Sequence, residues 1–199
     1  PYEKMLKVID KLIKKTNYIF EFIDLGGGMG ISYEKNNKKL NFKIYNALIN
    51  KFLIKNKCKI IFEPGRSIIG NAGILISKVI YIKKNKNKSF VILDAAMNDL
   101  MRPALYGAKH QIIPSKKNKK ITNKIFEFVG PICESTDKFL TTKKFQNIRE
   151  GELIIICDVG AYGMSLSSNY NVRTLPAEIL VKNSKMQVIK SRQKLSDII

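Results

Sequence analysis

The sequence of 199 residues has no tryptophan, one histidine and three cysteines. Because His110 stands alone and Cys58, Cys133 and Cys157 form no C-x-x-C pair, we expect no structural metal site. An odd number of widely spaced cysteines is untypical of a disulfide framework and favours a cytoplasmic location. No run of roughly 18 apolar residues occurs, so we expect no transmembrane helix and no membrane partner.

Acidic residues are also scarce: 16 stand against 36 basic residues, for a formal net charge of +20. Clustered lysines and arginines neutralise phosphates, so one hypothesis is a basic nucleic-acid-binding module. However, the lysines alternate with asparagines in tracts such as 83–88 and 115–120, which connect strand-like segments and are typical of solvated loops. No pattern of stacking aromatics accompanies them, so we expect no nucleic-acid partner.

The first third of the chain alternates helix and strand patterns. Apolar residues recur at helical spacing over 1–15 and 41–56, and each helix precedes an apolar strand, at 18–25 and 59–62. Since a complete (β/α)8 barrel takes about 250 residues, we assign residues 1–72 to the carboxy-terminal remnant of such a barrel. The sequence begins without methionine inside a helical pattern, so we expect a fragment cut on its amino-terminal side.

Residues 73–199 follow a different pattern, with short strands separated by turn signals. The predicted strands are 74–83, 89–94, 121–129, 153–157, 178–181 and 187–190. Such spacing is typical of an antiparallel β domain.

A glycine run, Gly26-Gly27-Gly28, follows the first predicted strand. Glycines at this position let backbone amides approach a phosphate, because no Cβ intervenes. The run matches neither a P-loop nor G-x-G-x-x-G, and a tight turn without a ligand is the alternative. The second strand ends in Glu63-Pro64-Gly65-Arg66, whose carboxylate suits a protonated pyridine nitrogen and whose guanidinium suits phosphate or carboxylate. The alternative there is a surface ion pair.

Three later segments carry further candidate side chains. Arg102 and Tyr106 are four residues apart, so on a helical turn they would project together toward a substrate carboxylate; otherwise Arg102 is a solvated charge and Tyr106 half-buried core. Cys133 adjoins Glu134, a pair able to donate a proton to carbon and to bind an ammonium, although a lone cysteine is more often an inert buried thiol. Tyr162 follows a strand end, where it either faces an anion or packs in a loop.

In this order the five segments resemble the diaminopimelate decarboxylases, which are fold-type III pyridoxal-phosphate enzymes. The resemblance covers essentially the whole chain and includes the closing segment 173–181 (RTLPAEILV). It implies an alanine-racemase-like architecture of mixed α/β and all-β domains: a (β/α)8 PLP-binding barrel and then a carboxy-terminal antiparallel β-barrel or sandwich.

The resemblance also implies roles for individual residues. Pyridoxal 5'-phosphate would be bound by Gly26, Gly27, Gly28, Glu63, Gly65, Arg66 and Tyr162. The substrate, meso-2,6-diaminopimelate, would be bound by Arg66, Arg102, Tyr106, Glu134 and Tyr162. Glu63 would pair with the pyridine nitrogen, Glu134 would contact the distal amino group, and Cys133 would be the catalytic proton donor. The products would be L-lysine and CO2, in the last step of lysine biosynthesis. Because the family's Cys-Glu loop reaches the partner subunit's site, the resemblance implies a homodimer with shared active sites.

One feature of the family is missing, and one neighbouring family is close. The lysine that carries the cofactor in the family lies in an early barrel strand outside this chain, so we expect the chain alone to be inactive. A sister decarboxylase of ornithine, arginine or carboxynorspermidine is the alternative. Those relatives commonly carry Cys-Asp where this chain has Cys133-Glu134, and the Arg102–Tyr106 pair favours a substrate with a second carboxylate.

Overall fold

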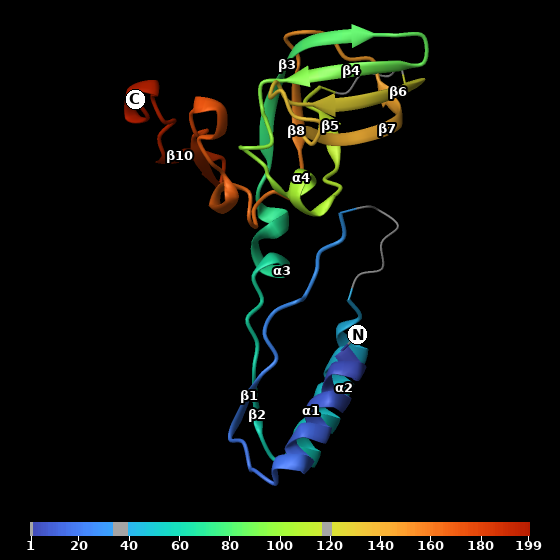
Figure 1. Ribbon diagram of the computed structural model, residues 1–199, viewed down its shortest axis with the longest axis vertical. Helices are drawn as coiled ribbons and strands as arrows, with labels where there is room; N and C mark the ends of the chain where they lie inside the picture. The colour runs from blue at the N-terminus through green and yellow to red at the C-terminus, as the bar shows by residue number, and fades with distance from the viewer. Residues whose placement is uncertain (1, 34–39, 117–120) are drawn as a thin grey trace. The chain divides into compact units, whose positions relative to one another are not determined.

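A computed structural model describes residues 2–33, 40–116 and 121–199 (Figure 1). The chain divides into two compact units, Pro1–Ile68 and Ile69–Ile199, called unit 1 and unit 2 below. Each unit has its own hydrophobic core. The division lies close to residue 72, where the sequence pattern changes from helix–strand alternation to short strands.

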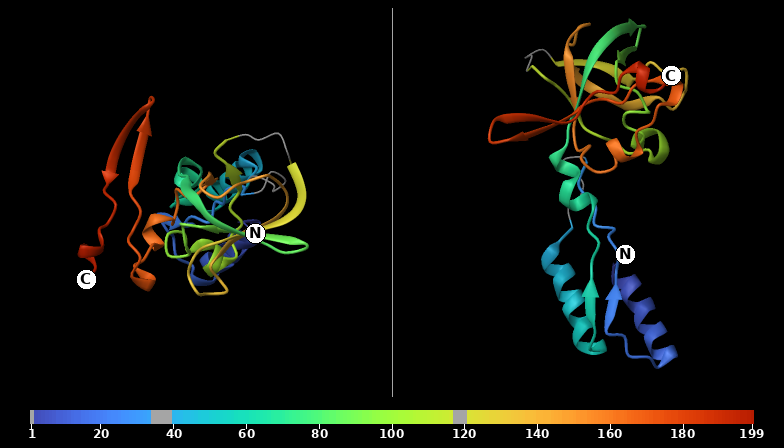
Figure 2. Two further views of the ribbon diagram at one scale, coloured as in Figure 1. Left: turned by 90° about the horizontal axis from the view of Figure 1, so that it is seen from above. Right: turned by 90° about the vertical axis from the view of Figure 1, so that its left-hand side faces the viewer.

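Unit 1 contains two helices and two short parallel strands. They are α1 (Tyr2–Thr16), β1 (Phe22–Asp24), α2 (Phe42–Asn56) and β2 (Lys59–Ile61). Strand β1 is shorter than the apolar run that predicted it. The strands pair in parallel with Ile23 opposite Ile60, and the helices lie alongside them (Figure 2). The order α–β–α–β with parallel pairing is the arrangement expected of a barrel segment.

Helix α2 begins and ends where its sequence dictates. The side chain of Asn41 accepts hydrogen bonds from the amides of Lys43 and Ile44, at 3.1 and 3.2 Å, which is an N-cap. At the other end Lys57 adopts a left-handed conformation and its amide donates to Leu53 O. The buried residues of the unit 1 core come from both helices and from the residue just before β2. They are Leu6, Tyr45, Ile49, Phe52 and Cys58.

Unit 2 is built on a six-stranded sheet with the order β5-β8-β3-β4-β6-β7 (Figure 1). The strands are β3 (Leu75–Lys84), β4 (Lys88–Leu93), β5 (Ile112–Pro114), β6 (Ile121–Val129), β7 (Lys138–Gln146) and β8 (Leu153–Ile156). A separate antiparallel hairpin consists of β9 (Glu178–Lys182) and β10 (Lys185–Lys190). Each of the six strands predicted after residue 73 is present, with ends displaced by at most two residues.

The sheet differs from the predicted antiparallel pattern at one pair. Strands β4 and β6 run parallel, with Val91 opposite Phe128, so the sheet is mixed. Parallel neighbours need a long crossover, and the chain between them contains α4 (Arg102–Tyr106) and β5. The crossover therefore places the Arg102 segment beside the sheet rather than in a tight hairpin.

The unit 2 core lies on the inner face of this sheet. Alternate residues of β4 are buried, and Val79, Val91, Leu93, Phe128, Ile154 and Ile156 are completely shielded from solvent. The ring of Phe145 on β7 packs edge-on against Phe128, with centroids 4.9 Å apart. Strand β7 was not predicted, because the lysines and threonines between its apolar residues obscure the apolar pattern of a strand in the sequence.

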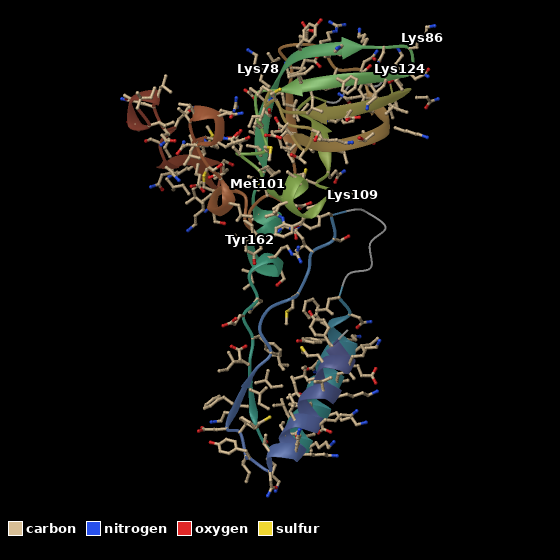
Figure 3. The ribbon with its side chains drawn as sticks, in the orientation of Figure 1. Lys78, Lys86, Met101, Lys109, Lys124 and Tyr162 are labelled. Carbon is tan, nitrogen blue, oxygen red and sulfur yellow. The ribbon has the colours of Figure 1, made fainter. Side chains whose placement is uncertain are left out.

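The lysine-rich tract 83–88 forms the tip of the β3–β4 hairpin, as expected of a solvated connection (Figure 3). Lys88 O accepts a hydrogen bond of 2.9 Å from Asn85 N, which closes the turn. Of the second tract, residues 117–120 lie outside the described residues. No helix in the described ranges is both long and apolar enough to cross a membrane.

Candidate active site

In unit 1, parallel strand pairing brings the glycine run next to the Glu63 segment. Leu25 N donates to Ile61 O at 3.1 Å, and two residues further Glu63 N donates to Gly26 O at 2.9 Å. Both motifs therefore follow the carboxyl ends of neighbouring strands, which is where barrel enzymes place their active sites.

The geometry of the glycine run explains why side chains are excluded from it. Gly26 and Gly28 have φ angles of +65° and +74°, and a Cβ on Gly27 would lie 2.5 Å from the carbonyl oxygen of Glu63. The Gly26 amide donates to the Asp24 carboxylate at 2.7 Å. In the part of the chain that the structure describes, the amides of Gly27 and Gly28 have no acceptor. Two free amides on a backbone that tolerates no Cβ fit a phosphate group.

Glu63 and Arg66 take separate directions after β2. Glu63 is exposed, whereas Arg66 is half-buried, with its guanidinium 6.0 Å from the centroid of the Tyr33 ring. Its Nη2 lies 3.8 Å from the Cβ position of Gly30, so Arg66 folds back toward the glycine segment. No ion pair joins Glu63 to Arg66 within the described residues, and the surface ion-pair alternative has no support. The carboxylate is thus available to a pyridine nitrogen, and the guanidinium to an anion.

In unit 2, Arg102 lies between two tyrosine rings. Its guanidinium is 5.7 Å from the Tyr106 centroid and 5.5 Å from the Tyr162 centroid. Arg102 is 6% exposed, while Tyr106 and Tyr162 are 65% and 46% exposed. The alternative of a solvated Arg102 beside a half-buried Tyr106 is therefore wrong, because it is the arginine that is buried. Figure 3 shows Tyr162 near Met101, which precedes α4. A guanidinium framed by two exposed phenols is suited to a carboxylate.

The backbone that presents Tyr162 is held by a close approach of two loops. Val159 N donates to Gly73 O and Gly160 N to Gly70 O, each at 3.0 Å. Gly73 and Gly160 approach so closely that a Cβ on Gly73 would lie 2.5 Å from the Cα of Gly160. Tyr162 itself has a left-handed φ of +64°. The pattern of the sequence does not reveal this contact, because its two glycine segments are far apart along the chain.

His110 is buried, and its titration gives a testable prediction. The ring Nδ1 lies 2.9 Å from Cys157 O, so the neutral ring donates there. Burial lowers the pKa of His110, and the charge of Arg102 lowers it further, while the hydrogen bond to Cys157 opposes both. Because folding favours the neutral ring, this contribution to stability is present above about pH 6.5 and is lost as the pH falls toward the folded-state value.

We therefore expect the unfolding free energy to decline below about pH 6.5, and His110→Gln to remove that part of the decline. Urea unfolding at a series of pH values measures both. As His110 is the only histidine, its ring resonances report the titration directly by NMR. A titration at or above the ordinary histidine value would contradict the prediction.

The loop 130–137 presents Cys133 and Glu134 to solvent. Both are exposed, so Cys133 is not the inert buried thiol that was the alternative. The loop is anchored by Asp137, whose carboxylate accepts from Met97 N at 2.7 Å and Ile132 N at 2.8 Å. Burial raises the pKa of Asp137. One buried carboxylate thus ties the Cys133 loop to the segment that leads into α4.

Glu134 has a partner that the sequence motifs did not indicate. The phenol of Tyr170 donates to Glu134 Oε1 at 2.6 Å, and this hydrogen bond raises the pKa of Tyr170. Within the described residues the second carboxylate oxygen, Oε2, has no hydrogen-bond partner. The two residues are 36 positions apart, so no local spacing could have suggested the pair.

The comparison with protein families rests on most of the chain. Residues 7–160 match the family described as pyridoxal-dependent decarboxylase, C-terminal sheet domain. The chain belongs to this family. Its members use pyridoxal phosphate, which confirms the cofactor expected from the sequence. The residue roles given above remain predictions.

Relatives with curated names agree with the family. The diaminopimelate decarboxylase of Aquifex aeolicus is 40% identical over 199 residues, covering 99% of this chain and 46% of the relative. The chain therefore spans about half the length of the curated relatives it matches.

Solved structures also agree. The Helicobacter pylori diaminopimelate decarboxylase complexed with L-lysine matches with a TM-score of 0.85 and 40% identity, over 98% of this chain and 48% of that one. The M. jannaschii enzyme in co-complex with L-lysine matches with a TM-score of 0.88 and 35% identity, over 98% of this chain and 46% of that one. The fold class expected from the sequence, the carboxy-terminal part of a fold-type III decarboxylase, is confirmed.

Proposed function

We propose that the polypeptide to which this chain contributes decarboxylates meso-2,6-diaminopimelate to L-lysine and CO2. The observation that carries the proposal is the buried guanidinium of Arg102 between the rings of Tyr106 and Tyr162. A guanidinium is permanently charged and presents a planar fork of donors, so in this setting it is suited to a carboxylate ligand. Together with the carboxylate of Glu134, it suits a substrate that carries both a second carboxylate and a distal ammonium.

Different residues of the chain would bind the cofactor, bind the substrate and transfer the proton. The amides of Gly27 and Gly28 would hold the cofactor phosphate, and Glu63 would hold the pyridine nitrogen in its protonated form. When bound, the cofactor withdraws electrons from the carbon that loses CO2. Arg102 and Tyr106 would orient a substrate carboxylate, with Arg66 as a further cation. The exposed thiol of Cys133 would deliver a proton to the carbon that has lost CO2.

The proposal includes a homodimer in which the loop 130–137 completes the partner's active site. The exposure of both Cys133 and Glu134 supports this part, because side chains with those roles must reach a substrate. The sister reaction, on ornithine, arginine or carboxynorspermidine, is less well supported. Each of those substrates carries only one carboxylate and therefore offers no second carboxylate for Arg102 to bind.

The experiment joins the chain to the amino-terminal half of the Aquifex aeolicus relative and adds pyridoxal phosphate. This hybrid enzyme should release CO2 from meso-diaminopimelate, and not from ornithine, arginine or lysine. Cys133→Ala should lower the rate but leave cofactor absorbance unchanged. The 199-residue chain without the added half is the control and should be inactive. Release of CO2 from ornithine or arginine instead would replace this proposal with the sister reaction.

A further inference from the structure

Tyr170 is the one phenol in the described part of unit 2 that donates a hydrogen bond to a residue of the Cys133 loop. It lies in a short 3-10 helix, Tyr170–Val172, outside the segments that carry the predicted site. Its oxygen is 2.6 Å from Glu134 Oε1, a short distance that is typical of an O–H donor on a carboxylate.

The two partners are held by a common buried support. The loop of Glu134 is fixed to Met97 N through the Asp137 carboxylate. The segment before Tyr170 is fixed to Asn98, the residue that follows Met97. Asn98 Nδ2 donates to Ser168 O and Ser168 N donates to Asn98 O, each at 3.0 Å. Asn98 is completely buried. The segments that carry Tyr170 and Glu134 are therefore anchored to two adjacent residues, Met97 and Asn98, which brings the two side chains within reach of each other.

A second set of contacts fixes the far side of Tyr170. Arg173 Nε donates to Asn98 Oδ1 at 3.2 Å, and Asn169 Nδ2 donates to Arg173 O at 2.8 Å and to Gln193 Oε1 at 2.6 Å. The residues on both sides of Tyr170 thus have defined partners, and the phenol is directed at the Glu134 carboxylate.

We propose that Tyr170 is a positioning residue that holds the Glu134 carboxylate for the distal ammonium of the substrate. This inference rests on the proposed function, which gives Glu134 that ammonium as its ligand. With Oε1 occupied by the phenol, the orientation of the carboxylate is set and Oε2 remains for the incoming cation. Pre-orientation of this kind favours binding because less rotational freedom is lost when the ligand arrives.

The kinetic test is a double-mutant cycle in the hybrid enzyme. Tyr170→Phe should raise KM for meso-diaminopimelate about tenfold while kcat changes less than about twofold, as expected when a contact to a charged group is lost. In a Glu134→Gln background the same change should have no further effect, because the group it positions no longer binds the ammonium. Tyr81→Phe is the matched control, since Tyr81 is a similarly exposed tyrosine of β3.

The kinetic outcomes decide between positioning and a general structural role. An unchanged KM in Tyr170→Phe overturns the proposal, and so does a lower one, which would mean that Tyr170 holds Glu134 away from the substrate. An increase in KM that persists undiminished in Glu134→Gln overturns it as well, since the effect would then not pass through Glu134.

A titration on the 199-residue chain and on the hybrid provides a readout independent of activity. In ring-labelled NMR spectra, Tyr170 should titrate above the ordinary tyrosine value of about 10 and return toward it in Glu134→Gln. An ordinary titration that does not respond to Glu134→Gln shows that no pair forms and overturns the inference. If the hybrid decarboxylates none of the tested compounds, the proposed function fails, and the titration still shows whether the pair exists.

Discussion

Arg102→Ala is expected to lower kcat/KM of the hybrid enzyme for meso-diaminopimelate by about 100- to 1,000-fold. Removing one partner of a buried, hydrogen-bonded charge pair costs roughly 3–4 kcal/mol, and each 1.4 kcal/mol is about a factor of ten. Arg102 would form such a pair with a carboxylate of the substrate, because it is 6% exposed and its guanidinium lies 5.7 and 5.5 Å from the Tyr106 and Tyr162 ring centroids. Steady-state kinetics with meso-diaminopimelate measure the effect.

Two further variants separate charge from shape. Arg102→Lys keeps the positive charge but loses the planar fork and the stacking against Tyr106 and Tyr162, so we expect it to recover only part of the lost activity. Arg149→Ala is the matched control, since Arg149 is exposed on the loop between β7 and β8 and should leave the kinetics unchanged. An Arg102→Ala hybrid with nearly full activity would show that the cation does not bind the substrate.

Gly160→Ala is expected to lower the free energy of unfolding by about 3 kcal/mol or more, a value in the upper range for single substitutions. The added Cβ would collide with the carbonyl oxygen of Ile69 and crowd Gly73 N, and both obstacles are backbone atoms. Backbone cannot rotate out of the way, so the loops must separate and break the hydrogen bonds from Val159 N and Gly160 N. Urea denaturation of the chain measures the loss.

Gly151→Ala is the control for this substitution. Gly151 has a φ of +81° but open space around its Cβ position, so alanine there should cost only about 1 kcal/mol of backbone strain. The difference between the variants isolates the collision at Gly160. Since Tyr162 is two residues away, the Gly160→Ala hybrid should also lose activity. Equal stability of the two variants would mean that the loops do not pack as described.

The sequence by itself determined the elements whose signals are local. The helical spacing of apolar residues predicts α2 within one residue, and short strand-like runs between turn signals predict six strands of unit 2. The spacing of Arg102 and Tyr106 predicts that they project together from one helical turn, as they do in α4. Each of these features depends on residues close together in the chain.

Only the tertiary structure decided which of these segments meet. Three contacts join residues that are far apart in the chain. They are the contact of Tyr162 with Arg102, the hydrogen bond from Tyr170 to Glu134, and the parallel pairing of β4 with β6. The burial of Arg102 was equally beyond the sequence, since arginine is ordinarily exposed. Such contacts form because the packed core of unit 2 and the close approach of Gly73 to Gly160 fix where the loops lie. That packing depends on side-chain volumes across the whole fold, which no local pattern of residues encodes.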